Sequence, residues 1–195
     1  GEIPTYREAR ALFWDRLYPH GAWTLYCGKH FSGPGIAVEV DHIYPVDWMV
    51  ASFGCHSRTQ CQQSNERFNR MEADLHNLYA ALAAIDGAQP NHAFGMIDGE
   101  DYFVQPACDF EHDLLRNITE PRPLARGNLA RAIFYMHTEY QLPIPPAMVM
   151  LLKRWNREDP PSRHEQQRNQ RIEQLQGTRN PFIDQPTLAE AIKAP

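Results

Sequence analysis

The sequence predicts an α+β fold that is mainly helical and carries a small antiparallel β element. Apolar residues recur at helical spacing through the C-terminal third, whereas residues 23–45 hold two short extended runs separated by a Gly-Pro-Gly turn. The 195-residue chain is 43% hydrophobic and 22% charged, which is ordinary for a globular protein and excludes disordered and fibrous classes. No apolar run approaches the roughly 18 residues of a membrane-spanning helix. We expect a single domain over residues 1–195.

The N-terminal elements are predicted from a capping motif and from a change in periodicity. Thr5 is followed three residues later by Glu8, a capping-box pattern that indicates a helix over residues 5–17. Extended structure is then predicted for residues 23–27 and 36–40, on either side of a turn at 33–35.

The rest of the chain is predicted to be helical except for two irregular regions. The first region, residues 46–64, holds Gly54 and two cysteines and is expected to be irregular. The second, residues 86–122, is rich in glycine and proline and is expected to be mainly loop, with a short strand considered at 102–104. Residues 65–79 carry apolar side chains at helical spacing and are expected to form a helix. Later helical segments are expected at residues 124–140, 145–155, 162–176 and 187–192, with Gly177 ending the third of them.

The net charge of −5 argues against a polyanionic partner, but the charge is unevenly distributed. Residues 1–115 carry 7 Lys/Arg against 16 Asp/Glu, whereas residues 116–179 carry 11 against 6. Such asymmetry indicates that the C-terminal helices could face phosphates. The alternative is an ordinary solvated helical face.

Four cysteines permit three pairings, and the sequence does not choose among them. Cys55 and Cys61 are close enough for a local disulfide, in which case Cys27 and Cys108 would close a long loop. The alternative is four reduced thiols in a cytosolic protein.

Residues suited to phosphodiester hydrolysis occur at the second predicted strand and after it. Asp41 and His42 end this strand, Arg58 lies in the following loop, and Asn77 lies in the helix predicted over residues 65–79. Hydrolysis requires a base for water, a hard divalent cation with oxygen ligands, and a cationic group that holds the phosphate. Imidazole, carboxylate with amide, and guanidinium suit these tasks. Taken singly, each residue also fits a surface or structural role.

Several separated blocks of sequence carry a family resemblance. The main blocks are Asp41-His42-Ile43-Tyr44-Pro45 with Trp48, then Arg58-Thr59-Gln60-Cys61, then Met71-Glu72-Ala73-Asp74-Leu75-His76-Asn77-Leu78. Further blocks follow in order, among them Cys108-Asp109-Phe110, Arg126-Gly127-Asn128-Leu129-Ala130-Arg131, Trp155-Asn156 and Gln176-Gly177. Over roughly residues 22–186 they resemble the bacterial endonuclease I family, which comprises periplasmic or secreted non-specific nucleases with a ββα-metal core.

The resemblance implies a role for each matched residue. His42 would be the general base for water, Arg58 would stabilise the phosphate, and Asp41 and Asn77 would be protein ligands of one Mg²⁺ ion, with Mn²⁺ or Ca²⁺ able to occupy the same site. The family usually has Glu where this chain has Asp41. It also usually has Arg shortly before the asparagine matched by Asn91, so we leave Asn91 out of the predicted metal shell.

The resemblance also implies a substrate and a location. We expect cleavage of DNA, and of RNA as well, to 5′-phosphate ends, in the periplasm or after secretion, by a protein that is monomeric by default. The catalytic core would span about residues 23–80, with a helical part over about 120–195.

Other residues have alternatives that remain open. Arg126 and Arg131 are expected to hold DNA phosphates, although Arg126 could instead pair with Glu120. Glu72, with Asp74, could contact a metal-bound water or form salt bridges. Two other functions fit the same sequence: a nucleic-acid-binding module that has lost catalysis, and a disulfide-stapled structural protein. DNA cleavage, DNA retention without cleavage, and failure to bind DNA distinguish the three functions.

Overall fold

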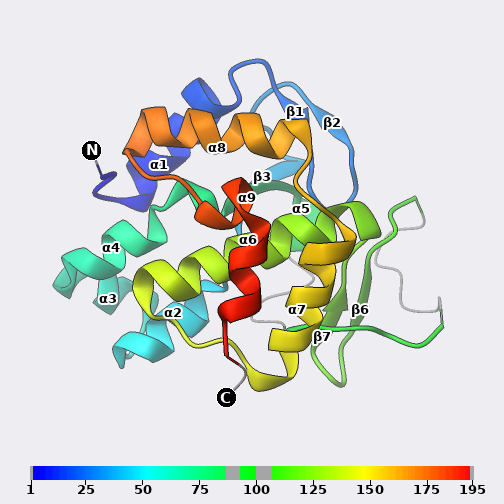
Figure 1. The fold of residues 1–195 in the computed structure, drawn as a ribbon. Coiled ribbons are helices and arrows are strands. Elements are labelled where there is room, and N and C mark those ends of the chain that lie inside the picture. Colours follow the sequence, from blue (N-terminus) through cyan, green and yellow to red (C-terminus); the bar gives the residue numbers. More distant parts are fainter. Residues whose placement is uncertain (1, 87–92, 100–106, 194–195) are drawn as a thin grey trace.

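The computed structural model describes residues 2–86, 93–99 and 107–193 and has the expected mixed α+β architecture (Figure 1). The α-helices of this part are α1 (Tyr6–Leu12), α2 (Val46–Phe53), α3 (Arg58–Ser64), α4 (Glu66–Glu72), α5 (Ala83–Asp86), α6 (Pro123–Tyr140), α7 (Pro146–Glu158), α8 (Arg163–Gln176) and α9 (Pro181–Asp184). A π-helical segment, η1 (Phe13–Leu17), continues α1, and 3₁₀ segments form η2 (Leu75–Asn77) and η3 (Pro186–Ala191).

The strands of the described part form small separate sheets. They pair as β1 (Ala22–Trp23) with β2 (His30–Phe31), as β3 (Val38–His42) with β4 (Leu78–Leu82), and as β5 (Ala93–Phe94), β7 (Ile118–Glu120) and β6 (Glu111–Asp113) in that order. The strand considered at residues 102–104 lies outside the described residues.

The antiparallel pair of β3 and β4 positions the two central residues of the predicted site. In its register, Asp41 lies opposite Tyr79 and His42 lies opposite Leu78. Successive side chains point to opposite faces of a strand, so Asp41 and His42 leave β3 on opposite sides.

The helix expected over residues 65–79 is wrong in its second half. α4 ends at Glu72, and the Asp74 carboxylate then caps η2 by accepting a hydrogen bond from the His76 N–H at 3.0 Å. β4 follows directly. Asn77 therefore lies in a 3₁₀ turn between helix and strand, not on a helix face.

Burial on both faces explains why β4 looked helical in the sequence. Tyr79 and Ala81 pack into the larger hydrophobic core with residues of α6 and α7, whereas Leu78 and Ala80 pack into a smaller core with residues of α1, η1 and α8. A strand that is buried on both faces is apolar throughout and lacks the alternation that marks a half-exposed strand.

The region 46–64, expected to be irregular, contains α2 and α3. Gly54 ends α2 in the left-handed conformation, with φ +69°, which suits glycine. Ser57 caps α3 by accepting a hydrogen bond from the Gln60 N–H at 3.1 Å. Both helices are short and lie next to turn-forming residues, which concealed their helical spacing in the sequence.

The helices expected elsewhere are confirmed. Thr5 caps α1 by accepting from the Glu8 N–H at 3.4 Å, and α6, α7 and α8 lie where the apolar spacing predicts them. Gly177 ends α8 with φ +87°. In Figure 1, α2, α3 and α4 gather on one side of the molecule, with α6 running through its middle and the β6–β7 sheet on the other side.

Both disulfides of the described part follow one of the three pairings. Cys27 joins Cys108 across 81 residues, and Cys55 joins Cys61 across 6 residues. The second bridge encloses the start of α3. Within the described residues, no helix is both long and apolar enough to cross a membrane.

Candidate active site

His42 is oriented by a backbone carbonyl at the end of α4. Its Nε2 lies 2.9 Å from the Glu72 carbonyl oxygen. Because a carbonyl oxygen can only accept, Nε2 must carry the proton in this bond, and the neutral ring then has its basic lone pair on Nδ1. The Tyr6 ring lies against the imidazole, with 4.7 Å between ring centroids. The imidazole is thus fixed from two sides, in the tautomer that a general base at Nδ1 requires.

Arg58 is held by the side chain of the same glutamate. As the first residue of α3, Arg58 donates from Nε to Glu72 Oε2 at 2.6 Å. The Arg58 side chain is 46% exposed, whereas that of Glu72 is 1% exposed. Among the described residues its terminal amino groups make no hydrogen bond, so they remain available to a phosphate. Gln62 adds hydrogen bonds of 2.9 and 3.1 Å to the Glu72 carboxylate.

Glu72 therefore connects the two predicted catalytic residues, a role that the sequence did not assign to it. Its carbonyl orients His42 and its carboxylate orients Arg58. The salt-bridging alternative considered for Glu72 is the one observed. In the sequence, Glu72 is recognisable only as an acidic residue within a block that resembles the family, and this pattern does not indicate which residues it contacts.

Asp41 is nearly buried on β3, whereas Asn77 has a structural role. The Asn77 side chain accepts from the Tyr44 N–H at 2.7 Å, donates to the Tyr44 carbonyl at 3.1 Å and is fully buried. This clamp holds the segment that follows His42 and uses both amide atoms. We therefore assign Asn77 to the fold and leave it out of the proposed metal shell.

The metal-ligand set is small in the part of the chain that the structure describes. No group of three or more His, Cys, Asp or Glu residues is placed there to hold a metal ion. Asp41, which precedes His42 on β3 and leaves the strand on its other face, supplies one carboxylate and is 9% exposed as a residue. A hard cation that keeps several water ligands fits such a donor set better than zinc does. Asn91 lies outside the described residues.

Arg131 does not lie on a nucleic-acid-binding surface. Its side chain is fully buried and forms a two-bond ion pair with Glu165, with distances of 2.7 and 2.6 Å. A further nitrogen donates to the Asn156 side chain and the Asp159 carbonyl. With its donors occupied inside the protein, Arg131 cannot reach a phosphate, and that expectation is corrected.

Arg126 is also engaged internally. It pairs with Glu120 at 3.2 Å, donates to the Pro121 carbonyl at 3.0 Å and lies over the Trp155 ring. The structural pairing considered for Arg126 is the one observed, and its side chain is only 17% exposed.

Most of the other basic side chains of the C-terminal part also bond to groups within the protein. Ion pairs with carboxylates are formed by Arg116, Arg126, Arg131, Arg154, Arg157 and Arg179. Backbone carbonyls receive hydrogen bonds from Arg122, Lys153, Arg168 and Arg171. Most of these basic groups are thus engaged within the protein, although the side chains of Arg116, Arg154 and Arg157 remain more than half exposed.

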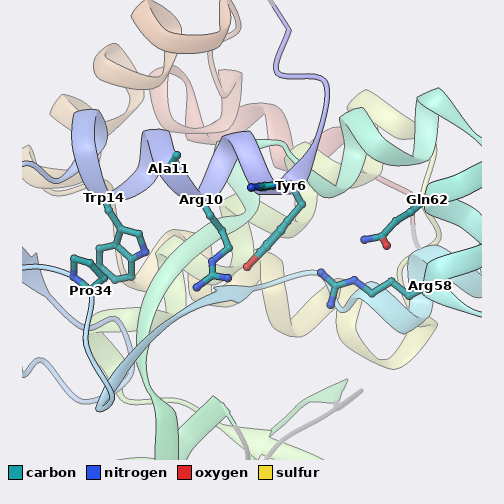
Figure 2. Close-up of a pocket in the computed structure, with 8 residues that line it drawn as sticks. Tyr6, Arg10, Ala11, Trp14, Pro34, Arg58 and Gln62 are labelled. Atoms are coloured by element: carbon teal, nitrogen blue, oxygen red, sulfur yellow. The ribbon is translucent and has the colours of Figure 1, made fainter.

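Positive charge reaches the site instead from α1, which lies in the acidic half of the chain. A pocket of about 510 Å³ beside Arg58 is lined by Tyr6, Arg7, Arg10, Ala11, Trp14, Pro34 and Gln62 as well. Figure 2 shows the side chains of Tyr6 and Arg10 descending from α1 while Arg58 extends toward them from α3. Sequence reasoning assigned no role to Tyr6 or Arg10. Their spacing of four places them on one helix face, which was the available signal.

Comparisons with known proteins match the chain to one nuclease family. The family model described as Endonuclease I matches residues 15–187. An extracellular deoxyribonuclease of Aeromonas hydrophila is 32% identical over 93% of this chain and 89% of its own length. A periplasmic deoxyribonuclease of the same organism is 31% identical over 87% of this chain and 81% of its own length. An extracellular ribonuclease of Bacillus amyloliquefaciens is 32% identical over 61% of this chain and 46% of its own length.

Proposed function

The chain belongs to the endonuclease I family, and we propose that the cluster around His42 hydrolyses phosphodiester bonds with one divalent metal ion and a histidine general base. The observation that carries this proposal is the double role of Glu72. Its carbonyl orients His42 and its carboxylate orients Arg58, so the base and the phosphate-holding cation are set relative to one another by one residue.

His42 and Arg58 have different tasks in the proposed reaction. Nδ1 of His42 removes a proton from a water molecule, and the resulting hydroxide oxygen forms a bond to phosphorus. The bond between phosphorus and the 3′ oxygen breaks and that oxygen takes a proton from solvent water, which leaves a 5′-phosphate on one product and a 3′-hydroxyl on the other. Arg58 donates to the phosphate oxygens while negative charge grows on them.

Asp41 is the protein ligand that the described residues offer for the cation. Proteins of this family depend on a metal ion, and we propose Mg²⁺ here, with Mn²⁺ or Ca²⁺ able to bind the same carboxylate. When bound, such an ion neutralises charge on the scissile phosphate and on the leaving oxygen. Hard oxygen donors, of which Asp41 is one, suit all three ions.

The substrate is proposed to be DNA, and RNA as well. Two similar proteins are named deoxyribonucleases and another is named a ribonuclease. His42 and Arg58 act on the phosphodiester itself, and backbone contacts carry no direct base information. Cleavage is therefore expected to tolerate any sequence. We further propose one nuclease domain over residues 1–195 that acts as a monomer.

The protein is placed outside the cytoplasm, in the periplasm or the medium. The similar deoxyribonucleases are named extracellular and periplasmic. Two disulfides fit that assignment, because structural disulfides persist in oxidising compartments and are rare in the cytosol.

A plasmid-nicking assay tests the proposal. Supercoiled DNA is incubated with the protein and Mg²⁺, Mn²⁺, Ca²⁺ or a chelator, beside H42A and the control H20A, which removes an exposed histidine. We expect the chelator and H42A to abolish cleavage and H20A to leave it intact. Cleavage that survives both the chelator and H42A would disprove the mechanism. Binding without cleavage at every ion would identify a catalytically impaired binding module instead.

A further inference from the structure

The pocket beside Arg58 is built largely by α1, which precedes the part of the chain that matches the family model. The match covers residues 15–187, whereas α1 spans Tyr6–Leu12. Among the described residues, the lining of this pocket includes three arginines and no carboxylate. A cationic wall of this kind suits an anionic ligand, and it adjoins the proposed catalytic residues.

The two arginines that α1 contributes are not used by the fold. Arg7 and Arg10 are exposed, and within the described ranges neither forms an ion pair with a carboxylate or a hydrogen bond. They differ in this from most C-terminal arginines, which are paired or bonded internally. Their charges are therefore available to a ligand that enters the pocket.

Tyr6 connects this wall to the reaction centre. Its ring lies 4.7 Å from the His42 ring, centroid to centroid. The same ring centroid lies 5.3 Å from Cζ of Arg58 and 6.0 Å from Cζ of Arg10. In Figure 2 the two guanidinium groups stand on either side of Tyr6. Arg58 and Arg10 thus line one pocket, and Tyr6, which lies between them, contacts His42.

Two cations in one pocket can hold neighbouring phosphates of one nucleic-acid strand. Each nucleotide of a strand carries one phosphate, so a strand that has its scissile phosphate at Arg58 and runs along the pocket brings a flanking phosphate toward Arg10. Arginine also binds phosphate through its planar fork, which gives the contact direction as well as charge.

We propose that α1 forms a binding subsite for the phosphate that flanks the scissile one, with Arg10 as its main contact and Arg7 as a second cation. The inference rests on the proposed nuclease function and extends it to substrate binding. α1 therefore belongs to the substrate-binding surface, and Arg10 positions the strand while His42 and Arg58 act on the scissile bond.

The salt dependence of cleavage tests this subsite. The values of kcat and KM on a short DNA duplex are measured between about 50 and 200 mM salt, a range over which phosphate contacts weaken steeply. The variants are R10A, R10K and R16A. Arg16 is the matched control, because it is exposed on η1, the continuation of α1, but does not line the pocket. Both alanine variants remove one positive charge from the same segment.

R10A is expected to raise KM roughly tenfold near physiological salt with little change in kcat, as loss of one charge-assisted contact predicts. The slope of log(kcat/KM) against log salt should become shallower by about 0.9, the value for one lost phosphate contact. R10K should restore most of the slope, and R16A should match the parent protein. Equal slopes in R10A and R16A would overturn the subsite while leaving the nuclease function intact. Absence of cleavage by the parent protein would instead overturn the function on which the subsite rests.

Discussion

Arg58 is held at the site by the buried carboxylate of Glu72, with 2.6 Å between Nε and Oε2. The backbone carbonyl of the same glutamate lies 2.9 Å from Nε2 of His42. A carboxylate that is 1% exposed needs partners, and Arg58 and Gln62 provide them. The pairing therefore stabilises a buried charge and at the same time fixes the direction of the Arg58 guanidinium.

The variant E72Q separates the two roles of this residue. The backbone carbonyl is unchanged, so His42 keeps its hydrogen bond, whereas Arg58 loses its charged partner. We expect kcat to fall about 10- to 100-fold, less than the roughly 10²- to 10³-fold loss expected for R58A, because misplacing a stabilising cation costs less than removing it. Steady-state cleavage of a DNA duplex measures both.

A double variant and a matched control decide whether the two residues act as one unit. R58A/E72Q should be no slower than R58A, since Glu72 acts on the reaction through Arg58. The control E158Q breaks an exposed pair, Arg154–Glu158, of similar geometry on α7 and should leave kcat unchanged. Losses in R58A and E72Q that simply multiply would contradict the positioning role.

Asp41 should control the metal requirement. D41N removes the charge from the proposed ligand while keeping its size, so we expect half-maximal activity to need at least tenfold more Mg²⁺. We also expect Mn²⁺ to rescue the activity of D41N better than Ca²⁺ does. Activity measured against metal concentration checks this. H42A, in contrast, should keep the parent affinity for Mn²⁺ when binding is measured directly by calorimetry.

Two asparagines serve as comparisons for Asp41. N77A should lower the free energy of unfolding, because it frees the Tyr44 backbone groups, but should leave the metal requirement unchanged. N91A tests the asparagine that we left out of the predicted metal shell, and it should likewise leave the metal requirement unchanged. An N77A protein that folds normally and needs much more metal would restore Asn77 to the metal site.

Apolar spacing predicted the long helices, although α6 is buried on most of its surface and the buried face of α8 is largely polar. α6 to α8 lie where apolar spacing placed them, and Gly177 ends α8 as expected. β4 was missed because it is buried on both faces, so no alternation marks it. The residue types of the site were identifiable from chemistry, but Glu72 was not, since its function depends on which atoms of α4 meet β3 and α3.

Counting charges along the sequence revealed that positive charge is concentrated in the C-terminal part. It did not reveal which of these charges face solvent. Net charge by segment does not distinguish an arginine that faces solvent from one that neutralises a buried carboxylate. Arg131 and Glu165 illustrate the second case, and Arg10 illustrates the first. Only the three-dimensional pairing separates them, because ion pairs join residues that are distant in the sequence.

The disulfides are expected to contribute differently to activity and stability. Cys55 and Cys61 enclose the start of α3, including Arg58, so C55A/C61A should lower kcat several-fold while costing about 2 kcal/mol in the chain-entropy model. Cys27 and Cys108 close a loop of 81 residues, and C27A/C108A should cost about 4 kcal/mol. Urea unfolding and cleavage assays on both proteins check this. A larger kcat loss from C27A/C108A, measured where both remain folded, would contradict it.

Arg131 is expected to matter for stability and not for substrate binding. It is fully buried against Glu165, and removing one member of a buried ion pair leaves an uncompensated charge that costs about 3 to 5 kcal/mol. R131A should therefore unfold at lower urea concentration, while KM for DNA stays the same in the folded protein. The control R154A disrupts an exposed pair and should cost less than about 1 kcal/mol.

The destabilisation of R131A should depend on pH, through Glu165. Burial raises the pKa of Glu165 even in the parent protein, where Arg131 opposes the shift. Without Arg131 the pKa rises further, so the folded variant binds a proton that the unfolded chain has released. A raised carboxyl pKa gives stability that is complete below the unfolded pKa of about 4.3 and is lost as pH rises through the folded value. The stability difference between parent and R131A should accordingly be larger at pH 8 than at pH 5, and R131M/E165Q should remove that dependence. Urea midpoints at the two pH values that shift equally in R131A and R131M/E165Q would rule out Glu165 as the origin.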